Sequence, residues 1–209
     1  QGPALADLVQ RAGSANTSIQ QAAGRLAEAR SLLRSADAAR SVQVGASAGV
    51  TRQAGAATTG SATPATLGTA GLNVSYELDL FGKLSQTSDA ARLDADARAA
   101  LLQSTRLMVQ ADVAQTYLQL RAAQTELQLV NESLAAYQDT LRLTQRRQQA
   151  GDVAELDVAR VQTEVAATES EALALQRQQA LLTNALAMLV GEVPGSFALP
   201  APAGDAALP

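Results

Sequence analysis

The 209-residue chain contains no histidine, no cysteine and no tryptophan, and these absences exclude several classes of protein chemistry. Without histidine and cysteine, the sites for zinc, haem and iron–sulfur clusters lose their usual ligands. The Ser-His and Cys-His pairs of nucleophilic enzymes are excluded for the same reason. The sequence therefore predicts no catalytic residue, no metal site and no cofactor, and we do not expect an enzyme.

Aromatic residues and excess positive charge are also scarce. Three tyrosines and two phenylalanines make up 2% of the chain, whereas 47% of it is hydrophobic. Compact cores normally use large rings, while small side chains suit helices that pack along their lengths. The formal net charge of −4 provides no long-range attraction for nucleic acid. We therefore expect extended helices and no nucleic-acid partner.

A run of about 18 apolar residues, the length of a bilayer-spanning helix, does not occur. The first forty residues instead predict two shorter helices. Pro3 suits a first helical turn, and the segment from Gly13 to Thr17 predicts a break. A second helix is expected over residues 17–39, where apolar residues recur at helical spacing.

Two later segments alternate between apolar and polar residues. They are SVQVGASAGVT (41–51) and GLNVSYELDL (71–80), separated by the small-residue segment 53–69. Strict alternation predicts half-buried strands, and we expect a mobile loop between them. Each segment also has about the 9–11 residues of a tilted transmembrane strand. A hairpin lying on a soluble core remains an alternative at this point.

From Lys83 to Ala150 the chain has no glycine or proline, which predicts one helix of roughly 100 Å. Leucine and valine recur every seven residues, as in the seam of a coiled coil. A second line of apolar residues lies on a neighbouring flank, so we expect two packing partners. The first seam contains Val113, Leu120, Leu127, Leu134 and Leu141, and the second contains Ala122, Leu129, Ala136 and Leu143.

The segment AGDVAELD (150–157) interrupts this helix, and a second helix is expected from about residue 154 to 190. The glycines and proline of VGEVPG end it, and a segment rich in proline and alanine follows. The predicted fold class is mainly α, with a long antiparallel, coiled-coil-like helical hairpin and two strands. Helix pairs with heptads are most often plain coiled coils, so the order of the elements carries more information than any one of them.

That order, with YELDLFGKL (76–84) at its centre, resembles the outer membrane factor family of TolC-like exit ducts. The OprM/NodT lipoprotein branch, which serves RND efflux pumps, is the most similar. Further matching motifs are PALADLVQRAGSANTSIQQAAGRLAEAR, ADVAQTYLQLRAAQTELQLV, RRQQAGDVAELDVARVQTE and NALAMLVGEVP. In that family, each protomer has two such repeats, and three protomers form a transmembrane β-barrel continued by a periplasmic helical tunnel. The resemblance implies that this chain is the N-terminal half of a TolC-like protomer.

The resemblance also implies a division of the chain into regions. The expected regions are N-terminal, equatorial-type helices at 1–40, a barrel strand pair with an extracellular loop at 41–82, and a periplasmic hairpin at 83–191. Residues 192–209 would link to a missing second repeat, and a secretion signal and a lipidated cysteine would precede the given residues. The chain departs from the branch at Tyr76, where Trp is frequent, and at ADAARSV, which lacks the usual proline before the first strand.

Alternation assigns the faces of the strands if they belong to a barrel. Val42, Val44, Val50, Leu72, Val74, Tyr76 and Leu78 would face lipid, and Gln43, Ser47, Thr51, Asn73, Ser75, Glu77 and Asp79 would face water. The opposite assignment would place carboxylates in hydrocarbon at a cost of several kcal/mol. The barrel–tunnel junction then comprises Tyr76, Glu77, Asp79, Phe81 and Gly82, where the glycine lets the strand turn into the helix. Glu77 and Asp79 have no partner base, so we do not expect them to be catalytic.

By resemblance, the tip of the hairpin docks a periplasmic membrane-fusion (adaptor) protein through Arg147, Gly151, Val153 and Leu156. Asp157 aligns with the acidic position that holds the aperture of TolC-like ducts closed. An alternative role for Asp157 is that of a first-turn acid, which stabilises a helix by about 0.3–1 kcal/mol through the helix dipole. Both roles are compatible.

The expected function is that of a passive outer-membrane exit duct with a periplasmic tunnel, in a tripartite efflux or export system. The expected partners are two further protomers of a homotrimer, outer-membrane lipid, the adaptor and an inner-membrane RND pump. The alternative is a soluble helical-hairpin scaffold or adaptor module, but an adaptor needs lipoyl-like β segments on both sides of its hairpin. For this chain alone, we expect the hairpin to self-associate, and residues 41–80 to be misplaced or partly helical relative to the family.

Overall fold

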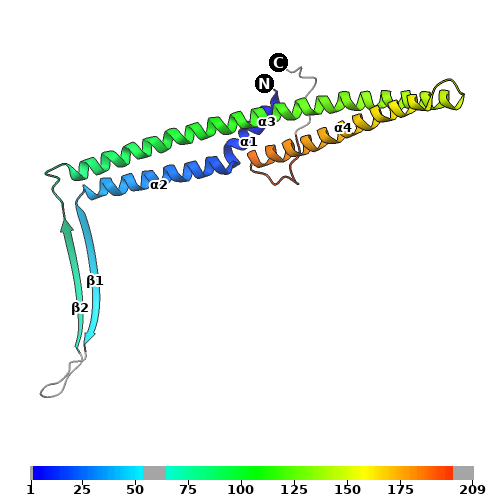
Figure 1. Cartoon of the computed structure of the whole chain (residues 1–209). Helices are drawn as coiled ribbons and strands as arrows, with labels where there is room; N and C mark the ends of the chain where they lie inside the picture. Colours follow the sequence, from blue (N-terminus) through cyan, green and yellow to red (C-terminus); the bar gives the residue numbers. More distant parts are fainter. Residues whose placement is uncertain (1, 54–64, 200–209) are drawn as a thin grey trace. The chain divides into compact units, whose positions relative to one another are not determined.

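The computed structural model describes residues 2–53 and 65–199. Its elements, in chain order, are helices α1 (Pro3–Ala15) and α2 (Thr17–Ala39), strands β1 (Gln43–Gln53) and β2 (Ala65–Ser75), and helices α3 (Lys83–Gln149) and α4 (Glu155–Leu189) (Figure 1). The chain forms two compact units, one of Ala23–Leu101 and one of Gln1–Ala22 with Leu102–Pro209. Helices α2 and α3 each contribute to both units.

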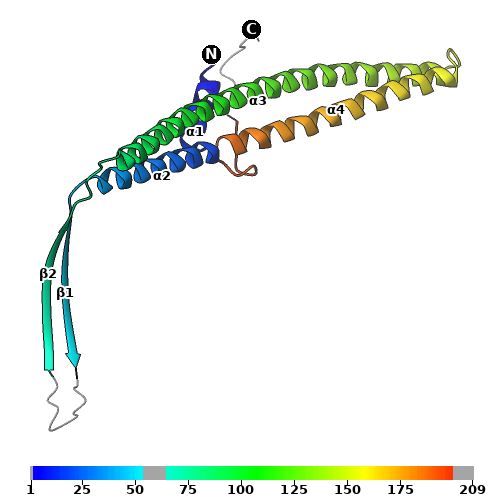
Figure 2. The same cartoon turned by 60° about the vertical axis from the view of Figure 1, so that its left-hand side comes forward.

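The strands belong to the unit of residues 23–101 and form an antiparallel pair (Figure 2). The register runs from Gln43 opposite Ser75 to Gln53 opposite Ala65. Val44 therefore faces Val74, so the even-numbered apolar residues of both strands share one side of the ladder. Most polar residues of β1 and β2 share the other side; Arg52 and Thr66 lie on the even-numbered side, and the apolar Leu67 lies on the odd-numbered side. The predicted alternation of the two strands is confirmed within these limits.

The limits of the second strand differ from the prediction. Strand β2 begins at Ala65 and ends at Ser75, whereas the alternation predicted a strand over 71–80. The pairing explains the difference, because α2 ends at Ala39 and β1 begins only at Gln43, opposite Ser75. Residues beyond Ser75 have no residue of β1 to pair with, whatever their sequence pattern.

Two expectations about residues 41–80 are therefore wrong. The segments 43–53 and 65–75 are strands and not partly helical. Residues 65–69 belong to β2, although they were expected in the loop, because β1 supplies a pairing partner for each of them. The remainder of the expected loop, 54–64, lies outside the described residues.

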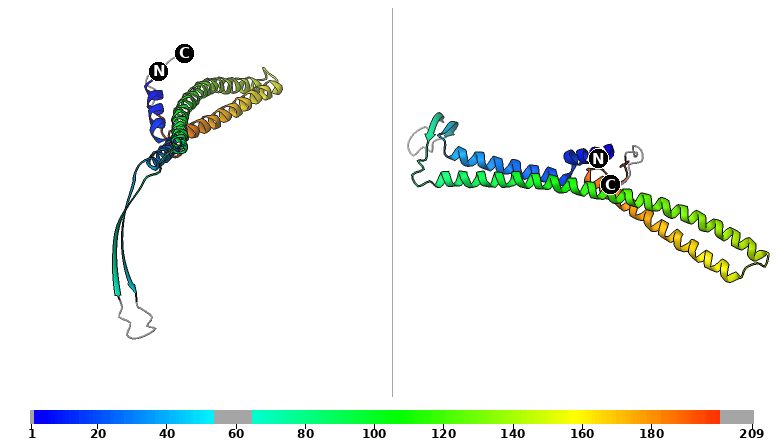
Figure 3. Two further views of the ribbon diagram at one scale, coloured as in Figure 1. Left: turned by 90° about the vertical axis from the view of Figure 1, so that its left-hand side faces the viewer. Right: turned by 90° about the horizontal axis from the view of Figure 1, so that it is seen from above.

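The hairpin of α3 and α4 occupies most of the other unit (Figure 3). The helix predicted from Lys83 to Ala150 is confirmed as Lys83–Gln149, and the helix predicted over about 154–190 as Glu155–Leu189. On the first predicted seam, Val113 and Leu120 are fully buried, and the three residues that follow it are half-buried. On the second predicted seam, Leu129 and Leu143 are 57% and 59% exposed. The first seam therefore packs within the chain, and the second has no partner among the residues that the structure describes.

The N-terminal helix packs at the base of this hairpin's unit. Leu8 and Ala12 of α1 are fully buried, as are Leu186 and Ala187 near the end of α4. The predicted break between Gly13 and Thr17 is confirmed, because α1 ends at Ala15 and α2 begins at Thr17. No helical segment in the described part of the chain combines the length and hydropathy that a membrane crossing requires.

Candidate functional site

The tip of the hairpin is a tight turn closed by backbone hydrogen bonds. The N–H of Asp152 donates to the carbonyl of Arg147 (2.9 Å), and that of Gly151 donates to Gln148 (3.0 Å). Gly151 has φ +84°, a left-handed conformation that favours glycine. This pair of bonds around a left-handed residue is the Schellman motif, which satisfies the last carbonyls of a helix. Arg147 and Gly151 therefore form the turn itself.

Asp157 begins the return helix. Its Oδ2 accepts a hydrogen bond from the N–H of Ala154 (3.2 Å), and its own N–H donates to the carbonyl of Ala154 (3.0 Å). Ala154 has no side-chain oxygen to accept from the first N–H groups of α4. The carboxylate of Asp157 instead satisfies the N–H of Ala154, which is one half of a capping box. The interpretation of Asp157 as a first-turn acid is confirmed by this geometry.

The structure brings the five predicted tip residues into one short segment, and most of them are accessible. Leu156 is 60% exposed, Val153 and Asp157 are half-buried, and Arg147 and Gly151 are exposed. No residue is buried anywhere in the described stretch from 131 to 164. One hydrogen bond joins the helices there, from Gln138 Nε2 to Glu169 Oε1 (3.4 Å). The tip therefore presents an apolar side chain on a loosely packed end of the hairpin.

The junction between β2 and α3 depends on Asp79. Its Oδ1 accepts a hydrogen bond from the N–H of Leu84 (3.1 Å), and its Oδ2 accepts one from the N–H of Ser85 (2.8 Å). These backbone bonds, chiefly the one from Ser85, hold the pKa of Asp79 below its ordinary value. Gly82 precedes the helix with φ +73° and has no side chain to act as a cap. Asp79, three residues before Gly82, caps α3 instead.

This capping role was not predicted, although the sequence carries a signal for it. An aspartate stands just before a glycine that opens a helix without a side-chain cap of its own. The prediction that Tyr76 and Leu78 face one side of a strand, and Glu77 and Asp79 the other, does not apply, because β2 ends at Ser75. Tyr76, Leu78 and Phe81 are 57%, 68% and 94% exposed, respectively. The junction is thus an exposed apolar segment that leads into a helix whose first turn is capped by Asp79.

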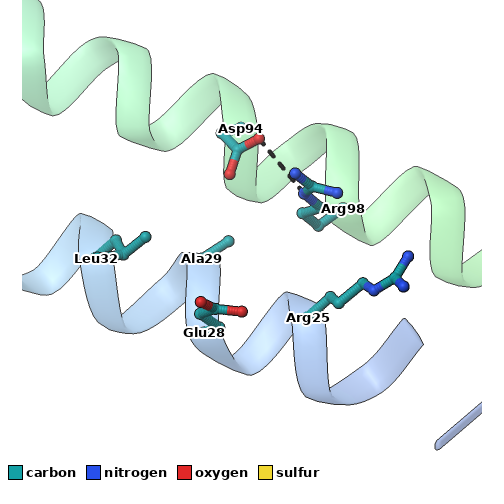
Figure 4. Close-up of a pocket in the computed structure, with 6 residues that line it drawn as sticks. All are labelled: Arg25, Glu28, Ala29, Leu32, Asp94 and Arg98. Atoms are coloured by element: carbon teal, nitrogen blue, oxygen red, sulfur yellow. Dashed lines mark ion pairs between the residues drawn. The ribbon is translucent and has the colours of Figure 1, made fainter. Parts of the chain in front are cut away.

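The remaining surface offers little chemistry. Among the described residues, no group of three or more carboxylates, histidines or cysteines could hold a metal ion. In the unit of residues 23–101, a hollow of about 270 Å³ lies between α2 and α3 (Figure 4). Its charged residues include Asp94 and Arg98, which form an ion pair of 3.4 Å one turn apart on α3. The hollow lies along the contact between the two helices, where ordinary helix packing explains it.

Comparison with known proteins gives consistent matches. Residues 8–192 match the family described as outer membrane efflux protein. The toluene efflux pump outer membrane protein TtgF of Pseudomonas putida is 31% identical over 192 residues, which cover 90% of this chain and 40% of TtgF. The cation efflux system protein CusC of Escherichia coli is 30% identical over 176 residues, covering 84% of this chain and 38% of CusC.

A solved structure agrees with these matches. The outer membrane protein VceC of Vibrio cholerae superposes with a TM-score of 0.79 at 30% identity, over 95% of this chain and 50% of VceC. This chain spans about 40% of the length of the curated relatives and about half of the solved one. The relatives are outer-membrane proteins, and the family locates this chain in the outer membrane. Its fold is that of half a TolC-like protomer, and the chain belongs to the outer membrane efflux protein family.

Proposed function

We propose that this chain supplies half of one protomer in a passive outer-membrane exit duct. In this proposal, β1 and β2 are two strands of the transmembrane barrel, and α3 and α4 are two helices of the periplasmic tunnel. Residues 1–40, before β1, form the equatorial-type helices, and residues 192–209 lead to a second repeat. Three complete protomers close the duct, which is lipid-anchored as in the branch that the sequence resembles.

The register of the strand pair carries this proposal. Val44, Val50, Leu72 and Val74 share one side of the ladder and are 70%, 79%, 82% and 68% exposed. A ladder with a mainly apolar side and a mainly polar side suits a barrel wall with lipid outside and water inside. A soluble scaffold would leave this side in water, where large apolar patches are rare unless they bind something.

The pore can be tested in the complete protein by cysteine substitution, because this chain contributes no cysteine of its own. Asn73→Cys lies on the polar side of the ladder, and Val74→Cys, the matched control, is next to it on the apolar side. A charged methanethiosulfonate reagent is expected to lower the single-channel conductance of Asn73→Cys in planar bilayers and to leave Val74→Cys unchanged. Equal responses, or no channel at all, would count against a duct and favour a soluble scaffold.

The tip is the proposed site of docking and closure. Leu156 is 60% exposed beside the Gly151 turn, which suits an apolar contact with a periplasmic adaptor linked to an inner-membrane RND pump. Leu156→Asp is expected to abolish cross-linking between the complete duct and its adaptor without changing its conductance alone. Leu181→Asp, at a 63% exposed position near the other end of α4, serves as the control. Retained cross-linking in Leu156→Asp would exclude this residue from docking.

Asp157 is the proposed gate residue, in addition to its role at the start of α4. An acidic side chain at the narrow end of a tunnel can pair with a basic residue of a neighbouring hairpin and hold the end closed. Asp157→Ala in the complete protein is expected to raise single-channel conductance. Asp152→Ala is the control, because it removes a carboxylate from the same turn but keeps the hydrogen bond between Asp157 and Ala154, and it should leave conductance unchanged. Unchanged conductance in Asp157→Ala would exclude the gate role.

A further inference from the structure

Asn16 stands where three helix ends meet. It is the residue after α1 and the residue before α2, and its side chain lies at the end of α4. It is 5% exposed, which is unusual for an asparagine. Its backbone N–H donates to the carbonyl of Ala12 (3.0 Å), so the backbone of Asn16 closes the last turn of α1.

The side chain of Asn16 uses both of its polar atoms on backbone groups of the other two helices. Its Oδ1 accepts hydrogen bonds from the N–H groups of Ser18 (2.9 Å) and Ile19 (3.3 Å) in the first turn of α2. Its Nδ2 donates to the carbonyl of Leu189 (2.8 Å), the last residue of α4. Unpaired backbone groups occur at the first and last turns of a helix. One amide therefore satisfies such groups at the start of one helix and the end of another.

Further contacts close the same corner around Asn16. Gly191, with φ +76°, lies so close to Ala15 that a Cβ at this position would stand 2.5 Å from the Ala15 carbonyl oxygen. The Arg11 guanidinium bonds to Glu192 and lies 5.6 Å from the centroid of the Phe197 ring. Residues 191–197 are thereby held against α1. We call Arg11, Asn16, Gly191, Glu192 and Phe197 the clasp.

We propose that the clasp, with Asn16 as its positioning residue, joins α1, the first turn of α2 and the last turn of α4 into one cooperative unit. The fully buried Leu8, Ala12, Leu186 and Ala187 lie in the elements that it joins, whereas the stretch 131–164 contains no buried residue. The base of the hairpin then opens only when the clasp opens, and the tip opens independently. This proposal goes beyond transport and stands or falls separately from the proposed duct.

The test is native-state hydrogen exchange on this chain with Asn16→Asp. Aspartate keeps an oxygen for the N–H groups of Ser18 and Ile19 but loses the donor to Leu189, so it separates the cap of α2 from the tie to α4. We expect amide protection to fall about tenfold or more in residues 186–192 and 8–16. Protection at Ser18 and Ile19 should fall with them although their acceptor oxygen is kept, because the first turn of α2 belongs to the same cooperative unit. Protection in the stretch 131–164 should stay unchanged.

Asn184→Asp is the matched control, because it makes the same chemical change at an exposed position of α4. It should alter none of these amides. Wild-type protection of residues 186–192 in Asn16→Asp would overturn the proposal, and so would an equal loss throughout 131–164. If Asn16→Asp does not fold, Gly191→Ala perturbs the clasp from the side of α4, and unchanged protection in residues 8–16 would then overturn it.

Discussion

Asp79 illustrates how the role of a single residue depends on where an element ends. The alternating pattern placed it on the polar side of a strand, beside Glu77. In the structure it lies beyond β2, and both carboxylate oxygens accept backbone N–H groups at the start of α3. The sequence showed the residue types of this junction, but the pairing of β1 and β2 decides which of them are in the strand.

Asp79 makes the start of α3 sensitive to acid. Its pKa is lowered mainly by the hydrogen bond from Ser85, so its contribution to stability is present above the unfolded-state pKa and is lost as the pH falls through the folded-state pKa. In an NMR titration, the Asp79 carboxyl carbon should therefore titrate below the ordinary value of 3.8. The amide shifts of Leu84 and Ser85 should follow the same midpoint and lose this step in Asp79→Asn. A midpoint at or above 3.8 would contradict the capping role.

Gly151 and Gly191 allow strain to be separated from close packing. Their φ angles are +84° and +76°, but a Cβ at Gly151 meets nothing within 4 Å, whereas one at Gly191 meets the backbone of Ala15. Gly151→Ala is expected to lower the free energy of unfolding by about 1–2 kcal/mol, the strain of a left-handed residue. Gly191→Ala should lower it further, because the Ala15 backbone must also move. Chemical denaturation measures both, and equal losses would contradict the packing at Gly191.

Among the elements, the helices were predictable and the limits of β2 were not. The absence of glycine and proline between residues 83 and 149 leaves no local signal that could end a helix, so the limits of α3 follow from the sequence. The alternation of apolar and polar residues over 71–80, in contrast, continues beyond Ser75, where β1 offers no further residue for pairing. Pairing between distant segments sets the ends of strands, and single-sequence patterns do not contain it.

Two leucines on different faces of α3 are expected to contribute unequally to the free energy of unfolding. Leu120 is fully buried between the helices, whereas Leu129 is 57% exposed. Leu120→Ala is expected to lower the free energy of unfolding by about 2–5 kcal/mol, and Leu129→Ala by less than about 0.5 kcal/mol. Urea denaturation of the chain at a concentration where it is monomeric makes the comparison. A large loss in Leu129→Ala alone would mean that the assigned faces of α3 are reversed.

At the scale of the whole molecule, the order of elements carried the prediction of the family, and the match over residues 8–192 confirms it. The tip residues lie in one short segment, 147–157, so the sequence could predict the turn that they form. Their roles in docking and closure stay predictions. The clasp was missed because Asn16 and Leu189 are far apart along the chain and meet only through folding. A single asparagine between two helices signals a cap, but it does not reveal a second helix end.

The exposed second seam predicts how the isolated chain behaves in solution. Leu129, Leu143 and Leu173 are 57%, 59% and 65% exposed on the hairpin. Burial of such residues against a second copy is favourable, by about 25 cal/mol per Å² of apolar surface. Size-exclusion chromatography with light scattering should therefore detect self-association, weakened in Leu129→Gln. A clean monomer at all concentrations would contradict this expectation.

The central claim is that the even-numbered side of the strand pair faces lipid. The chain contains no tryptophan, so single tryptophans can be introduced at Val74 and at its neighbour Asn73. The complete protein, with any other tryptophans replaced by phenylalanine, is reconstituted into vesicles that contain brominated lipids. Strong fluorescence quenching is expected in Val74→Trp and little in Asn73→Trp. Equal quenching of the two, or none in either, would contradict it.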